Sequence, residues 1–178
     1  VYAVVTALRG GFYGFYRSSD GGDSWNQQSN SPNILHWYSG QGNGGQGTYD
    51  LAILAAPNDV DKVYVAGVNT WVTDDVGKTW NGASYWTSQH GPSVHADQHY
   101  YDYNPLDGYI YLCHDGGVSR TKEIMPGSWI DANEDQYYEW PTVWEHLNDG
   151  LANFSFYRLG ISQSSSHNIY TGAQDMGT

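Results

Sequence analysis

The sequence of 178 residues predicts an all-β fold built from short strands and tight turns, and three observations support that class. The composition includes 22 Gly, 16 Tyr and 8 Trp, which is typical of strands joined by turns and not of helices. No window shows a sustained helical period, whereas short apolar or alternating runs recur between Gly-containing turns. Residues 73–80 also repeat the layout of residues 18–25, which indicates a duplicated strand-turn-strand unit.

Each octet places a hydroxyl residue, an Asp, a Gly and a Trp at the same spacing, and we expect these positions to be structural. They are Ser18, Asp20, Gly22, Trp25, Thr73, Asp75, Gly77 and Trp80. The Asp carboxylate can accept backbone N–H groups within the turn, and Gly can adopt a positive φ without penalty. The Trp then begins the next strand with a ring large enough to bury against the neighbouring unit.

The predicted strands fall into four units along the chain. They cover residues 1–5, 12–17, 51–55, 62–67, 68–72, 99–103, 109–113, 118–120, 156–162 and 168–172. A Gly-rich stretch at about residues 29–48 is predicted to be a long surface loop, and an acidic stretch at about residues 123–153 is predicted to be an insertion.

Units of about 45 to 60 residues, each a four-stranded antiparallel sheet, match the blades of a β-propeller. A propeller has at least about four blades, so residues 1–178 are predicted to form one partial propeller domain of about three to four blades. A strand is already under way at residue 1, and residue 178 falls inside a turn motif. We therefore expect an excerpt of a longer chain, with the remaining blades supplied by the parent protein or by partner subunits.

The two octets resemble the Asp-box, or bacterial neuraminidase, repeat of sialidases, sortilin-type receptors, xyloglucanases and a large group of secreted bacterial propellers. Two further stretches resemble the last group: residues 94–99 continuing to 113–118, and residues 156–158 continuing to 170–177. The resemblance implies blades whose octets lie on the outer part, away from the ligand face. It also implies that the protein is secreted, to the extracellular space or the cell surface.

Composition limits the partners. A net charge of -12, from 7 Lys and Arg against 19 Asp and Glu, disfavours nucleic acid and polybasic attachment to anionic lipid. No apolar run reaches the ~20 residues of a membrane helix, so we expect no membrane insertion. Cys113 is the only cysteine, which we expect to be buried as a small hydrophobe, and no cofactor is predicted.

Candidate site residues follow the later strands. They are His95, Asp97, His99, His114, Asp115, Gln174 and Asp175. In an extended segment His95, Asp97 and His99 would point the same way, and Gln174 and Asp175 follow a strand as Asp115 does. Three interpretations stay open: a buried His/Asp network between blades, a metal site at His95, Asp97 and His99, and a ligand or catalytic site.

The acidic stretch also contains aromatic residues, of which Trp140 and Trp144 are ligand-binding candidates. Aromatic rings beside carboxylates are typical of sugar-binding rims, because a ring face stacks on a pyranose while the acids accept its hydroxyl hydrogens. The competing interpretation is a solvated acidic loop.

These features favour a non-catalytic propeller module that binds carbohydrate or protein ligands. The alternative is a glycoside hydrolase whose carboxylates come from Asp97, Asp115 and Asp175. Sialidase activity is disfavoured, because the resembled sialidases use an arginine cluster and this chain has only Arg9, Arg17, Arg120 and Arg158. A second alternative is a structural module of a large surface assembly, since a fold alone does not select a function.

Overall fold

The structure is a computed structural model that describes residues 1–37, 40–86, 93–132, 135–139, 141–150, 156–164 and 168–173. Its regular elements are all strands, β1 to β15, which confirms the all-β prediction. The described residues contain no helix, and therefore none long and apolar enough to cross a membrane. The chain forms two compact units, Val1–Leu147 and Asn148–Thr178.

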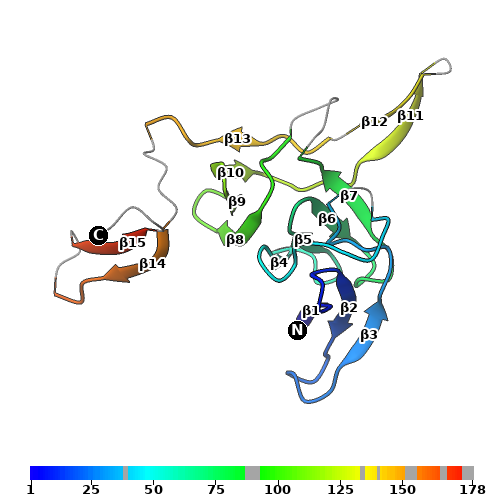
Figure 1. The fold of residues 1–178 in the computed structure, drawn as a ribbon, viewed down its shortest axis with the longest axis horizontal. Helices are drawn as coiled ribbons and strands as arrows, with labels where there is room; N and C mark the ends of the chain where they lie inside the picture. Colours follow the sequence, from blue (N-terminus) through cyan, green and yellow to red (C-terminus); the bar gives the residue numbers. More distant parts are fainter. Residues whose placement is uncertain are drawn as a thin grey trace. The chain divides into compact units, whose positions relative to one another are not determined.

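The first two sheets are antiparallel meanders in chain order (Figure 1). The first contains β1 (Tyr2–Thr6), β2 (Phe12–Arg17) and β3 (Asn26–Ser29). The second contains β4 (Ala52–Ala55), β5 (Val63–Ala66), β6 (Thr70–Thr73) and β7 (Asn81–Ser84). Each octet forms the connection before the last strand of its sheet, between β2 and β3 and between β6 and β7.

The third sheet has the same meander order with a hairpin inserted before its last strand. Its strands are β8 (Gln98–Asn104), β9 (Tyr109–His114), β10 (Gly117–Thr121) and β13 (Glu145–His146). The inserted hairpin pairs β11 (Ser128–Ala132) with β12 (Asp135–Glu139). The stretch predicted as an insertion thus also supplies the fourth strand of this sheet. In the second unit, β14 (Phe156–Ile161) pairs with β15 (Ile169–Ala173).

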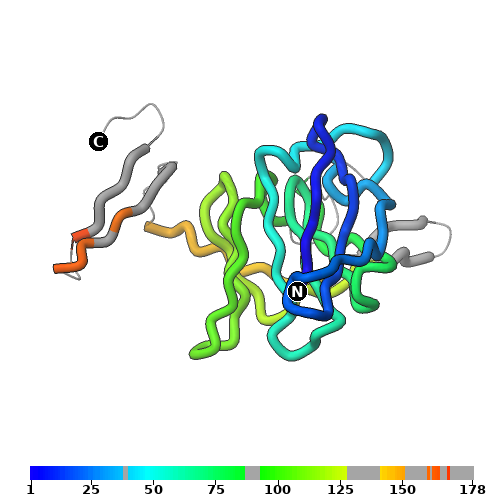
Figure 2. Tube along the Cα trace, turned by 90° about the horizontal axis from the view of Figure 1, so that it is seen from below, coloured from blue at the N-terminus to red at the C-terminus, as the bar shows by residue number. Residues whose placement is uncertain are grey.

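The second sheet lies between the first and the third, and its two faces fill two separate apolar clusters (Figure 2). Val63 and Val65 of β5 pack with Phe15 of the first sheet. Tyr64 and Ala66, which alternate with them, pack on the side of the third sheet. Burial on both faces explains why β5 is apolar throughout instead of alternating with polar residues. The described sheets do not close into a ring.

The octets form the turns that their residue types predict. In the second octet the amide of Gly77 donates to Oγ1 of Thr73 at 2.9 Å, and the amide of Thr79 donates to Oδ1 of Asp75 at 2.9 Å. The first octet makes the equivalent contacts, Gly22 to Ser18 at 2.8 Å and Ser24 to Asp20 at 3.0 Å. All four bonds are local, so the turn is fixed by the octet itself.

The two octet tryptophans have different surroundings. Trp80 is 7% exposed, packs edge-on against Phe15 at 5.0 Å between ring centroids, and donates to Oγ of Ser29 at 2.9 Å. Trp25 is 42% exposed, and its indole nitrogen donates to the carbonyl of Gly22 within its own turn. The expectation that both rings bury against a neighbouring unit is therefore confirmed for Trp80 and wrong for Trp25 among the described residues.

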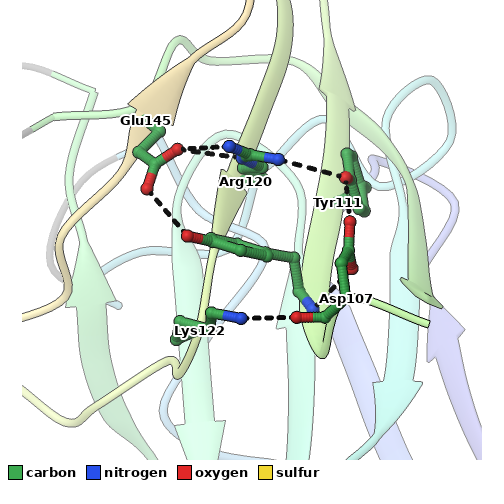
Figure 3. A network of polar contacts seen from close by, with 6 residues as sticks. Asp107, Tyr111, Arg120, Lys122 and Glu145 are labelled. Atoms are coloured by element: carbon green, nitrogen blue, oxygen red, sulfur yellow. Dashed lines mark hydrogen bonds and ion pairs between the residues drawn. The ribbon is translucent and has the colours of Figure 1, made fainter. Parts of the chain in front are cut away.

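A polar network fastens the short β13 strand to the third sheet (Figure 3). Arg120 of β10 donates from Nε to Oε2 of Glu145 at 2.9 Å, and Tyr109 donates to the other oxygen at 3.1 Å. The Tyr109 ring also contacts two cations, with Arg120 at 4.2 Å and Lys122 at 3.8 Å from its centroid. Cys113, on β9, is exposed, so the prediction of a buried cysteine is wrong.

Candidate ligand-binding site

Five of the predicted site residues lie at the end of the sheets opposite the octets: His95, Asp97, His99, His114 and Asp115. Antiparallel neighbours run in alternate directions, so the connections that enter a new sheet lie at the far end from the octet turns. The described parts of those connections are residues 30–37, 40–51, 85–86 and 93–97, and the β9–β10 turn lies at the same end. Two backbone bonds cross this end: the amide of Gln98, the first residue of β8, donates to the carbonyl of Gly67 in the β5–β6 turn at 2.9 Å, and the Asp115 amide donates to the Asp97 carbonyl at 3.2 Å.

Asp115 lies at the centre of one half of this site. Nε2 of His99 lies 2.9 Å from its Oδ1, and the Tyr49 hydroxyl donates to its Oδ2 at 3.4 Å. The Tyr49 ring meets the His99 ring edge-on, with 5.1 Å between centroids. The side chains of His99 and Asp115 are partly exposed, so a ligand can reach them.

Asp97 lies at the centre of the other half of the site. Its backbone is left-handed, whereas the sequence predicted an extended conformation. Its φ of 59° is left-handed, and β8 begins only at Gln98, so residues 95–97 do not extend that strand. The premise that His95, Asp97 and His99 point the same way along one strand is therefore wrong. Oδ1 of Asp97 instead accepts a hydrogen bond from Nε2 of Gln46 at 2.9 Å.

The structure does not arrange His95, Asp97 and His99 as ligands of one metal ion. Among the residues that the structure describes, no three His, Cys, Asp or Glu side chains are arranged to hold a metal ion. His95 instead stacks on the His114 ring, with 5.8 Å between centroids and 16° between planes.

His114 belongs to a buried network within the third sheet. Its Nε2 lies 2.8 Å from Oγ of Ser119, and that oxygen lies 2.9 Å from Nδ1 of His146. Burial, and then the charges of His95 and His146, lower the pKa of His114 to about 4. A neutral, buried His114 matches the network interpretation better than the ligand-binding one.

Asp50 is a site residue that the sequence did not single out. Its side chain has no exposed surface, and neither carboxylate oxygen accepts a hydrogen bond from the described residues. Burial, and then the charge of Asp97, raise the pKa of Asp50 to about 7, with a smaller contribution from Asp115. Asp50 stands just before β4 as Asp97 stands just before β8, and this matching position is the pattern that could have revealed it.

Three exposed aromatic side chains lie on the same connections, and we call Trp37, Tyr49 and Trp86 the aromatic rim. They are 38%, 61% and 42% exposed, respectively. The indole nitrogen of Trp37 donates to Oε1 of Gln46 at 2.8 Å, and that of Trp86 donates to the Trp37 carbonyl at 3.1 Å. Residues 29–48 were predicted to be only a long surface loop, and Trp37 within this Gly-rich stretch is the signal that could have indicated a binding role.

The remaining candidates do not add to the site. Trp144 is buried in the core cluster shared by the second and third sheets, so its assignment as a ligand-binding ring is wrong. Trp140, Gln174 and Asp175 lie outside the described residues. A groove of about 540 Å³ lies next to the first octet and is lined by Tyr2, Arg17 and Ile53 among others, but it contains none of the predicted ligand-binding residues.

No family model, curated protein or solved structure matches this chain. The Asp-box resemblance therefore stays a prediction from the motifs, and the function is argued from the geometry of the site.

Proposed function

We propose that the chain is part of a secreted or surface-exposed Asp-box β-propeller that binds carbohydrate at the aromatic rim. Sheets in meander order, packed face to face with β1 beside β4 and β4 beside β8, support the propeller assignment. The octet turns at one end and the candidate site at the other fit the arrangement that the resemblance implies. Further blades would come from the parent chain or from partner subunits.

One observation carries the carbohydrate assignment: the exposed rings and the carboxylates belong to the same hydrogen-bonded system. Trp37 is linked through Gln46 to Asp97, and Tyr49 is bonded directly to Asp115. A ring held in a fixed orientation can stack on a pyranose with little loss of side-chain entropy. The neighbouring carboxylates can then accept hydrogen bonds from the sugar hydroxyls.

Glycoside hydrolysis is the second candidate, and Asp50 is the observation that favours it. A carboxyl group with its pKa raised to about 7, beside a second carboxylate, has the properties of a general acid and its partner. Asp50 has no exposed surface, however, and a sugar cannot contact it in this structure. Binding without cleavage is therefore the function that the geometry supports best.

Affinity electrophoresis tests the proposal, with the protein run through gels that contain neutral polysaccharides such as mixed-linkage β-glucan and xyloglucan. We expect retardation of the wild type, and a loss of affinity of about tenfold or more in Trp37→Ala or Tyr49→Ala, because a stacked ring contributes roughly 1–2 kcal/mol. Trp25→Ala is the matched control, since this ring is exposed to the same degree as that of Trp86 but lies at the octet end.

Equal retardation of wild type, Trp37→Ala and Tyr49→Ala, or retardation of none of them, would overturn the carbohydrate assignment. Release of reducing ends during incubation, abolished by Asp97→Asn or Asp115→Asn, would instead establish the hydrolase. Thermal unfolding of each variant separates the loss of a contact from the loss of the fold.

A further inference from the structure

Asp50 is a buried carboxylate whose two oxygens lack a hydrogen-bond partner from another described residue. Both of its oxygens are inaccessible to solvent. Its position is fixed, because the Asp50 amide donates to the Gln46 carbonyl at 3.0 Å at the end of the connection that enters β4. Gly67 lies against it, and a side chain there would begin 3.3 Å from the Asp50 carbonyl oxygen.

The charges that act on Asp50 are all negative. After burial, the negative charge of Asp97, a hydrogen bond with its side chain when Asp50 is protonated and, less strongly, the charge of Asp115 all raise the pKa of Asp50. Lys62 and Arg120 pair with Glu123 and Glu145 elsewhere on the molecule. A buried carboxylate without a partner costs several kcal/mol, so the Asp50–Asp97 pair requires either a shared proton or a bound cation.

The atoms around this pair are those that a hard cation prefers. Asp50 presents two carboxylate oxygens without a hydrogen-bond partner among the described residues, and the carboxylate of Asp97 accepts from Gln46 through its Oδ1. Ca²⁺ binds carboxylate, carbonyl and water oxygens and accepts irregular arrangements of them. Two carboxylates with the remaining ligands from water or backbone are typical of weak sites, which in extracellular modules have dissociation constants of about 0.1–1 mM.

We propose that Asp50 and Asp97 bind a calcium ion, which joins the connection at residues 30–51 to the connection at residues 85–97. The ion neutralises the carboxylate that orients Gln46 and, through it, Trp37. The site shares Asp97 with the hydrogen-bonded system of the aromatic rim, but the calcium proposal stands whether or not the chain binds carbohydrate.

Thermal unfolding at pH 8 tests the site in EDTA, in about 5 mM CaCl₂ and in about 5 mM MgCl₂. We expect Ca²⁺ to raise the Tm of the wild type by roughly 3–8 °C, and Mg²⁺ by much less. Asp50→Asn should lose this response, because it keeps the shape of the side chain and removes its charge. Asp23→Asn is the matched control, since this exposed acid of the first octet leaves the same net charge and should keep the full response.

Three results would overturn the proposal. A wild-type Tm that is unchanged by Ca²⁺ would show that a proton alone satisfies the pair. An equal response to Mg²⁺ would reveal diffuse screening of the acidic surface, and a full Ca²⁺ response in Asp50→Asn would place the ion elsewhere. If Asp50→Asn does not fold, Tb³⁺ luminescence of the wild type and of Asp97→Asn decides, because only the wild type should bind Tb³⁺ in a manner displaced by Ca²⁺.

Discussion

Trp80 and Trp25 hold the same position in the two octets, but only Trp80 is covered by a neighbouring sheet. The difference extends to the glycine three residues earlier. A Cβ on Gly77 would lie 2.1 Å from Cδ1 of Phe15, whereas a Cβ on Gly22 would meet only Cζ2 of Trp25, at 3.9 Å. The same motif is therefore packed against a neighbouring sheet in one octet and exposed in the other. Matched substitutions in the two octets can thus separate the contribution of the turn to stability from the contribution of packing.

Gly77→Ala should destabilise the protein far more than Gly22→Ala. Both glycines have positive φ, 88° and 108°, so each substitution costs about 1 kcal/mol in backbone strain. Gly77→Ala adds a clash with Phe15, and overpacking of this kind costs about 1–3 kcal/mol more. Urea unfolding of the two variants measures the difference. Equal losses would mean that Phe15 relaxes freely, or that a further surface covers Gly22.

Asp75→Ala should lower the free energy of unfolding by about 1–2 kcal/mol, because Asp75 accepts several hydrogen bonds within its turn. Burial alone would raise the pKa of Asp75, but hydrogen bonds from Thr79, Thr73 and the Lys78 amide hold it below its ordinary value. Asp74→Ala is the control at the adjacent exposed position, with an expected change within about 0.5 kcal/mol. A comparable loss in both variants would contradict the turn-specific role of Asp75.

The octet turns could be predicted from the sequence because all their bonds are local. The site could be predicted only in part, because its geometry depends on how separate sheets pack. Asp115 was found because it follows a strand, and Asp97 from an alternation that its left-handed backbone does not keep. Asp50 also precedes a strand, but that the charge of Asp97 acts on it depends on how the connections pack. Trp144 was misassigned for the same reason, since it becomes a core residue only because β13 returns to the third sheet.

Glu145→Gln should loosen β13 without unfolding the sheet. The substitution removes the charge that pairs with Arg120, so amide exchange in the two-residue β13 strand should become faster than in the wild type. Glu123→Gln breaks the pair with Lys62 and is the control, with no expected change at β13. Unchanged exchange in Glu145→Gln would show that backbone pairing alone holds the strand. Hydrogen exchange read by mass spectrometry or NMR makes the measurement.

Acidification should destabilise the protein between about pH 6.5 and pH 4 through His114. Its pKa falls from the ordinary 6.5 to about 4 on folding, because it is buried beside His95 and His146. Within that window the unfolded state binds the proton and the folded state does not. The contribution of neutral His114 to the free energy of unfolding is therefore complete above pH 6.5. It is lost as the pH falls toward 4, by on the order of 2–3 kcal/mol.

The contribution of His114 is isolated by comparing the wild type with His114→Gln in urea unfolding at pH 7.5, 5.5 and 4.5, a series spanning about three units around the expected transition. Carboxylates titrate in both proteins, so their contribution cancels in the difference between the two curves. We expect the wild type to be the more stable at pH 7.5 because Gln reproduces the bond to Ser119 imperfectly, and the two curves to converge on acidification. Parallel curves would mean that His114 takes up its proton without opening the network with Ser119 and His146.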